Sequence, residues 1–173
     1  MKPWFATATL MAVACNGALF TTEIRDQSLV TIETIDAVDQ LTLDEFAGIN
    51  LTESTSLQNQ GVEPGDINNV TMTEFTMLAI DGDLDLAFLD SVNLYVQSDG
   101  LPKTLVASAE DFPQGIALIS FDLEDVDLTA YVVSESMDFT TEVIGNHPNQ
   151  TTRIEAEYAI DVGVTGQGAC NNL

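Results

Sequence analysis

Basic residues are scarce in this chain of 173 residues. Only 4 Lys and Arg stand against 28 Asp and Glu, which gives a formal net charge of −24 and a sequence pI near 4.1. Such a surface lacks the cations that displace counterions from phosphates, and it repels anionic lipid headgroups. We therefore expect no nucleic-acid partner, whereas cations and basic proteins remain compatible with the composition.

Residue types that often carry catalysis are also few. The single histidine, His147, lies in a turn between Asn146 and Pro148, where exposure is expected, and no Gly-x-Ser-x-Gly segment is present. Aromatic residues make up only 7% of the chain and offer few platforms for sugars. We expect no enzymatic activity and no cofactor. A carboxylate-dependent envelope hydrolase remains an alternative because acids are abundant.

The chain is nevertheless apolar enough to fold. Hydrophobic residues amount to 45% and the mean hydropathy is +0.14, which argues against a disordered acidic chain. A length of 173 residues suits one domain with a real core. We therefore interpret the acidity as the coat of a single folded domain.

The N-terminal segment has the pattern of an export signal. Lys2 is followed by an uncharged run as far as Glu23, and Cys15 comes directly after Ala12-Val13-Ala14. This segment resembles the lipobox of bacterial lipoproteins, in which small residues precede a cysteine that receives a diacylglycerol before cleavage. The resemblance implies a signal peptide at residues 1–14, lipidation of Cys15, and attachment to the cell envelope, at the outer membrane, through the lipid.

Two other interpretations of this segment remain open. The same Ala-Val-Ala sequence suits the ordinary signal peptidase, which would leave a soluble periplasmic or secreted domain that Cys15 and Cys170 could close with a disulfide. Alternatively, residues 4–22 form an uncharged run nearly long enough for an uncleaved membrane anchor.

Period-two alternation dominates the chain after a tether expected at residues 15–27. It predicts half-buried strands at 91–97, 136–143 and 153–164. Further strands are expected at 29–35, 46–51, 70–80, 104–108 and 116–123, the last with a bulge near Ile119. The predicted inward-facing residues are Val92, Leu94, Val96, Met137, Phe139, Thr141, Val143, Ile154, Ala156, Tyr158, Ile160, Val162 and Val164.

These strands predict an all-β fold. Helical spacing occurs only at 37–45 and 124–132, and turn signals separate the strands at regular intervals. We expect an acidic, antiparallel two-sheet sandwich over residues 28–165, with immunoglobulin-like or jelly-roll connectivity, followed by a Gly-rich tail at 166–173.

Two further motifs carry a family resemblance. Residues 86–96 (LAFLDSVNLYV) followed by 99–102 (DGLP), and residues 127–131 (DLTAY) before a strand, are similar to patterns in uncharacterised lipoproteins of Gram-negative bacteria. The resemblance implies a β-sandwich and assigns no catalytic residue. Together with the lipobox, it suggests a membrane-tethered, non-catalytic domain with a structural or protein-binding role.

A group of carboxylates suggests an alternative function. Asp81, Asp83 and Asp85 have the spacing of the first ligands of a calcium loop, and Asp90 lies nearby as another oxygen donor. Leu86 stands where an EF-hand requires Gly, so the segment is no EF-hand. A calcium-stabilised adhesion or binding module would use these four residues, whereas a solvated acidic stripe beside a turn would not bind metal.

Overall fold

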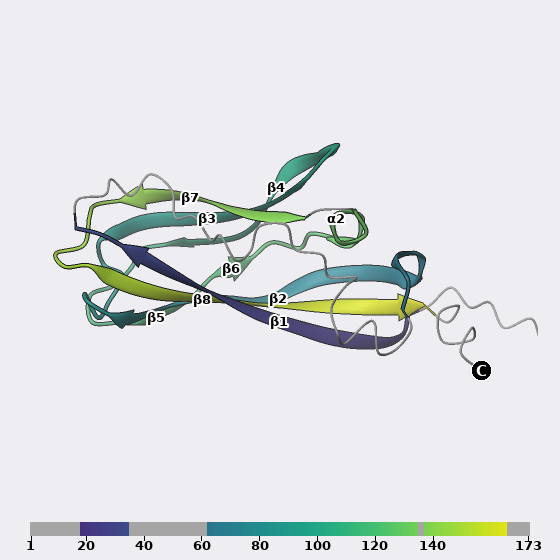
Figure 1. Cartoon of the computed structure of the whole chain (residues 1–173), viewed down its shortest axis with the longest axis horizontal. Helices are drawn as coiled ribbons and strands as arrows, with labels where there is room; N and C mark the ends of the chain where they lie inside the picture. The colour runs from purple at the N-terminus through teal and green to yellow at the C-terminus, as the bar shows by residue number, and fades with distance from the viewer. Residues whose placement is uncertain (1–17, 35–61, 135–136, 166–173) are drawn as a thin grey trace, which may run out of the picture.

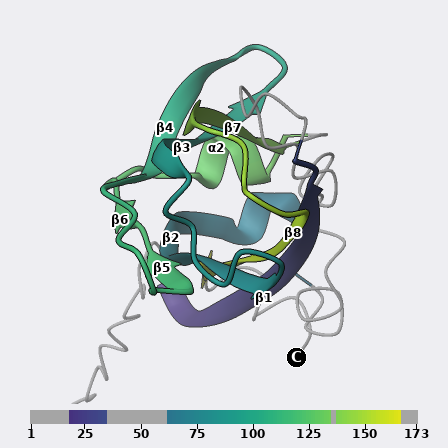
Figure 2. The same cartoon turned by 90° about the vertical axis from the view of Figure 1, so that its left-hand side faces the viewer.

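The computed structural model describes residues 18–34, 62–134 and 137–165, which form two four-stranded antiparallel sheets packed face to face (Figure 1). The predicted all-β sandwich is confirmed. Figure 2 shows β3, β4 and β7 as one layer above β1, β2 and β8. The strands are β1 (Ala18–Ile32), β2 (Ile67–Asp81), β3 (Leu89–Ser98), β4 (Leu101–Glu110), β5 (Leu118–Ser120), β6 (Asp122–Leu123), β7 (Asp138–Gly145) and β8 (Thr152–Thr165).

The strand order shows how the chain winds between the layers. One sheet has the order β1-β8-β2-β5 and the other β6-β4-β3-β7. Among the described strands, only β3 and β4 are both consecutive and paired. The chain crosses from one sheet to the other after β2, β4, β5 and β7. The loops after β2, β4 and β7 therefore gather at one end of the sandwich.

The core lies between the sheets, where the alternation predicted it. Every predicted inward residue of β8 is at most 1% exposed, and those of β3 are fully buried. The ring centroids of Phe139 on β7 and Tyr158 on β8 lie 5.5 Å apart, which joins the two sheets through their inner faces. Burial of these apolar side chains is the main force that holds the layers together.

The prediction of a tether at residues 15–27 was wrong for residues 18–27, which belong to β1 and pair with β8. Residues 18–27 are strand, in register with β8 from Ala18 opposite Thr165 to Ile32 opposite Thr152. The alternation of β1 is weak because Thr22 and Asp26 interrupt its apolar positions, so the sequence pattern missed this strand. β1 pairs with β8 through backbone hydrogen bonds, which do not require alternating apolar side chains.

The prediction of a bulge near Ile119 was wrong, because the chain passes from one sheet to the other at this point. β5 pairs with β2 in one sheet, whereas β6 pairs with β4 in the other. Phe121 lies between the two short strands and is buried, with its ring edge-on to Phe75 at 4.7 Å between centroids. The change of phase in the sequence therefore marks the point where the chain crosses the core.

Helix is as sparse as expected in the described part of the chain. The expected helix at 124–132 is reduced to α2 (Thr129–Val132), and a 3-10 turn, η3, spans Pro64–Asp66. No helix among the described residues is long and apolar enough to cross a membrane. The predictions of a signal peptide and lipidation at Cys15, a helical segment at 37–45, a strand at 46–51 and a C-terminal tail with Cys170 concern residues outside the described ranges.

Among the described residues, Arg25 and Lys103 are held in ion pairs on the sheet surfaces, and Lys103 bonds Glu142 at 2.7 Å. Arg25 on β1 bonds Glu23 at 2.8 Å, Glu74 on β2 at 2.7 Å and Glu157 on β8 at 3.2 Å. Hydrogen bonding to Glu23, then to Glu74 and Glu157, raises the pKa of Arg25 above its already high value. These groups are largely exposed, so the cluster relieves local repulsion and adds little to stability.

Candidate functional site: a polar hollow at the loop end

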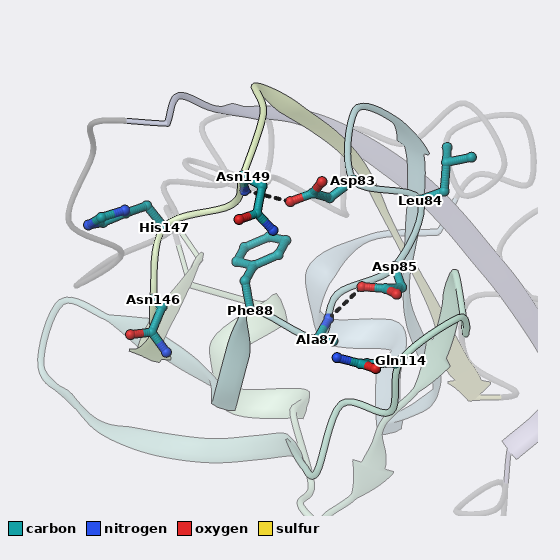
Figure 3. Close-up of a pocket in the computed structure, with 9 residues that line it drawn as sticks. All are labelled: Asp83, Leu84, Asp85, Ala87, Phe88, Gln114, Asn146, His147 and Asn149. Carbon is teal, nitrogen blue, oxygen red and sulfur yellow. Dashed lines mark hydrogen bonds between the residues drawn. The ribbon is translucent and has the colours of Figure 1, made fainter.

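Three loops meet at the end of the sandwich where β2, β4 and β7 finish. They surround a hollow of about 390 Å³ that is open to solvent and lined mainly by polar residues (Figure 3). Its size falls within the range of roughly 300–1,000 Å³ that is usual for small-ligand sites. The lining residues are Asp83, Leu84, Asp85, Ala87, Phe88, Gln114, Asn146, His147 and Asn149.

Glycines allow the loops after β2 and β7 to pack closely. A Cβ on Gly82 would overlap the carbonyl oxygen of Thr151 and lie 2.7 Å from Cα of Thr152. A Cβ on Gly145 would lie 2.7 Å from the carbonyl oxygen of Phe88, which also accepts a 2.7 Å hydrogen bond from the backbone N–H of Asn146. The two loops are therefore in backbone contact on both sides of the hollow.

The carboxylate of Asp83 connects these same loops. Its Oδ2 accepts a 2.6 Å hydrogen bond from the backbone N–H of Asn149, and its Oδ1 accepts a 3.3 Å bond from Nε2 of Gln150. The backbone N–H of Asp83 in turn donates to Oγ1 of Thr152 at 3.0 Å. Asp83 thus joins the loop after β2 to the start of β8.

Asp85 connects the loop after β2 to the loop after β4. Its Oδ1 accepts a 3.1 Å hydrogen bond from the backbone N–H of Ala87, and its Oδ2 accepts a 2.7 Å bond from that of Gly115. Gly115 has a φ of +76° in the turn that it occupies. Asp83 and Asp85 therefore extend to different neighbouring loops.

The four proposed calcium ligands do not converge in the structure. Asp81 accepts a hydrogen bond from the backbone N–H of Gly82, and Asp90 is exposed at the start of β3. No three carboxylate, histidine or cysteine groups among the described residues lie close enough together to hold a metal ion. The geometry gives Asp83 and Asp85 another role, which is to fasten loops.

Asp90 lines a second, neighbouring hollow of about 420 Å³. Ala87 belongs to both hollows, so the segment after β2 separates them. Asp111, with a φ of +59°, and the buried Phe112 form part of the far wall. The loop end is therefore acidic on both sides of Ala87.

Sequence reasoning identified the pieces of the polar hollow but missed its assembly. The segment from Asn146 to Pro148 was predicted as one of the turns that separate the strands, and His147 is exposed as expected. Nothing in the spacing showed that these turns meet the Asp83 loop, because that depends on which strands share a sheet. Phe88, in the middle of the group in Figure 3, was assigned only to a family motif.

The segments 99–102 and 127–131 meet at the opposite end of the sandwich. The buried Tyr131 donates a hydrogen bond from its hydroxyl to the carbonyl oxygen of Pro102 at 2.8 Å and lies 2.7 Å from Oγ1 of Thr104. Val70 donates its backbone N–H to Oγ1 of Thr129, whose own hydrogen bonds lower the pKa of Asp127. These hydrogen bonds join α2 to β2 and β4.

The polar hollow presents carboxylates, carboxamides and one imidazole. Among its described lining residues none carries a hydroxyl or thiol that could act as a nucleophile, while carboxamides and carboxylates supply hydrogen-bond donors and acceptors. Compared with known proteins, the chain matches no family model and no curated protein.

Proposed function

We propose that this protein is an exported, lipid-anchored component of a bacterial cell envelope whose β-sandwich is a non-catalytic binding or structural module. The observation that carries the proposal is the position of Cys15, directly after Ala12-Val13-Ala14 and three residues before β1 begins at Ala18. A diacylglycerol on Cys15 would hold the domain at a membrane surface.

The direction of β1 supports a binding role. Ala18 pairs with Thr165 at one end of the sandwich, and Ile32 pairs with Thr152 at the other end, next to the polar hollow. A strand of 15 residues spans roughly 45 Å, at about 3.3 Å per residue. A lipid at Cys15 would therefore leave the hollow facing away from the membrane, where a ligand or protein partner has free access.

Mass spectrometry of the mature protein from a bacterial host tests the anchor. We expect acyl mass on Cys15 and partition of the full chain into the detergent phase. Cys15→Ser should abolish both, whereas the matched control Cys170→Ser should change neither. An unmodified N-terminus at Cys15 would contradict the proposal and favour a soluble exported domain.

The absence of catalysis is tested with the same material. Because both oxygens of Asp83 and of Asp85 already accept hydrogen bonds from the loops, we expect no turnover of a panel of chromogenic glycosides. Turnover that is lost in Asp83→Asn or Asp85→Asn would instead establish a carboxylate-dependent hydrolase.

A further inference from the structure

We infer that the polar hollow binds a neutral oligosaccharide, an inference that rests on the proposed function as a binding module and names its ligand class. The inference rests on three carboxamides, two hydrogen-bonded carboxylates and one phenyl ring that surround a single open hollow. Each component matches one property of a sugar.

The carboxamides match the hydroxyl groups. Gln114, Asn146 and Asn149 are exposed and come from two different loops, and each offers both an N–H donor and a carbonyl acceptor. A sugar hydroxyl likewise donates and accepts at once. Side chains of this kind on opposite walls can therefore bond neighbouring hydroxyls of one ring.

The carboxylates supply acceptors whose positions are already set. Both oxygens of Asp83 and both oxygens of Asp85 accept hydrogen bonds from the loops, so their orientation does not need to be fixed when a ligand binds. A carboxylate offers about four acceptor sites, and the two hydrogen bonds that each group accepts leave capacity for ligand hydroxyls. Such preorganisation reduces the entropic cost of binding.

Phe88, which is half-buried, adds a small apolar surface to the otherwise mainly polar hollow. Its ring lies among Asn146, His147 and Asn149 in Figure 3 and packs only partly against the core. The backbone of Phe88 is held by the hydrogen bond from Asn146 and by close contact with Gly145. The C–H face of a pyranose can pack on such a ring while its hydroxyls reach the surrounding polar groups.

Charge decides between neutral and anionic sugars. The net charge is −24 and two carboxylates line the hollow, so an acidic saccharide would be repelled. A Lys- or Arg-rich peptide would be attracted by the charge, but it would leave the three carboxamides without a specific role. The lining therefore favours a neutral saccharide over a basic peptide.

Binding of neutral oligosaccharides by the full chain, purified from membranes in detergent, tests the inference. The probes are arrayed β-1,4-linked oligomers of glucose, N-acetylglucosamine and mannose, followed by calorimetry with each oligomer that binds. We expect Gln114→Ala combined with Asn146→Ala to weaken binding at least tenfold. Both side chains are exposed, so an unchanged melting curve should show that the variant is folded.

The control variant is Gln27→Ala, which removes an exposed carboxamide from β1 outside the hollow and should leave binding unchanged. The inference is overturned if no oligomer binds, if the double variant binds as well as the parent, or if a Lys-rich peptide binds in the hollow in preference to every oligomer. Acyl mass on Cys15 is measured separately, so failure of the sugar site is distinguishable from failure of the anchor.

Discussion

At the residue scale, the position of Gly82 requires glycine for two reasons: its φ is positive, and a neighbouring backbone lies too close for a side chain. Its φ is +84°, and it lies against Thr151 and Thr152. Gly100 has a similar φ of +79° with nothing within 4 Å of the Cβ position, so it isolates the cost of the backbone conformation alone.

We expect Gly100→Ala to cost about 1–2 kcal/mol of unfolding free energy because of the left-handed conformation. Gly82→Ala should cost more, by roughly a further 1–3 kcal/mol, because the added methyl group has no room. Urea denaturation of the two variants measures the difference. Equal losses would show that the contact between the loops after β2 and β7 is not tightly packed.

The acids Asp81, Asp83 and Asp85 show which contacts a local sequence pattern can predict and which it cannot. The segment with Asp81, Asp83 and Asp85 was correctly placed beside a turn, but the spacing of alternate residues gave no information on what each carboxylate bonds. Asp83 bonds the loop before β8 and Asp85 bonds the loop before β5. Those partners lie 66 and 30 residues away, beyond the range of any local pattern.

At the scale of elements, the strands that local pattern predicts best are those with one fully buried face. β8 and β3 lie inside their sheets, so every second residue is buried and alternation is strong. β1 lies at the edge of its sheet in the described structure and tolerates polar residues at inward positions, which hid its first half. Alternation records burial, whereas pairing at an edge depends mainly on the backbone.

The crossing between β5 and β6 gives a prediction at the element scale. Phe121 is the only residue between these two short strands, and its ring packs against Phe75 of β2. Phe121→Ala should lower the free energy of unfolding by about 3–5 kcal/mol, because it removes a buried aromatic ring and leaves a cavity. Thermal denaturation followed by circular dichroism measures the loss.

Ile119→Ala is the comparison for this variant, since Ile119 is a partly buried residue of β5. It should be clearly milder than Phe121→Ala. Similar losses for the two variants would indicate that β5 as a whole, and not the ring at the crossing, holds the sheets together there.

At the scale of the whole molecule, the excess of acids predicts a response to salt. A net charge of −24 destabilises the compact state through repulsion, and added ions screen it. We expect calcium and magnesium chloride at equal ionic strength to raise the melting temperature by the same amount, because the described carboxylates do not gather into a metal site.

Differential scanning fluorimetry after treatment with EDTA makes this measurement, with sodium chloride of matched ionic strength as the control. A rise specific to calcium is what a binding site in the native state requires by mass action. Such a rise, if lost in Asp83→Asn, would revive the calcium-stabilised module suggested by the spacing of the acids.

The pairing of β1 with β8 also sets how the domain responds to mechanical load. A pull at the start of β1, resisted by a ligand held at the far loops, acts along the strand axis, so the hydrogen bonds between Ala18 and Ile32 share the load simultaneously. A pull that separates the start of β1 from the end of β8 acts across the strands and breaks those bonds one after another. The same ladder is therefore strong in shear and weak in peeling, and in the proposed arrangement a load between a lipid on Cys15 and a ligand in the polar hollow would fall in the strong direction.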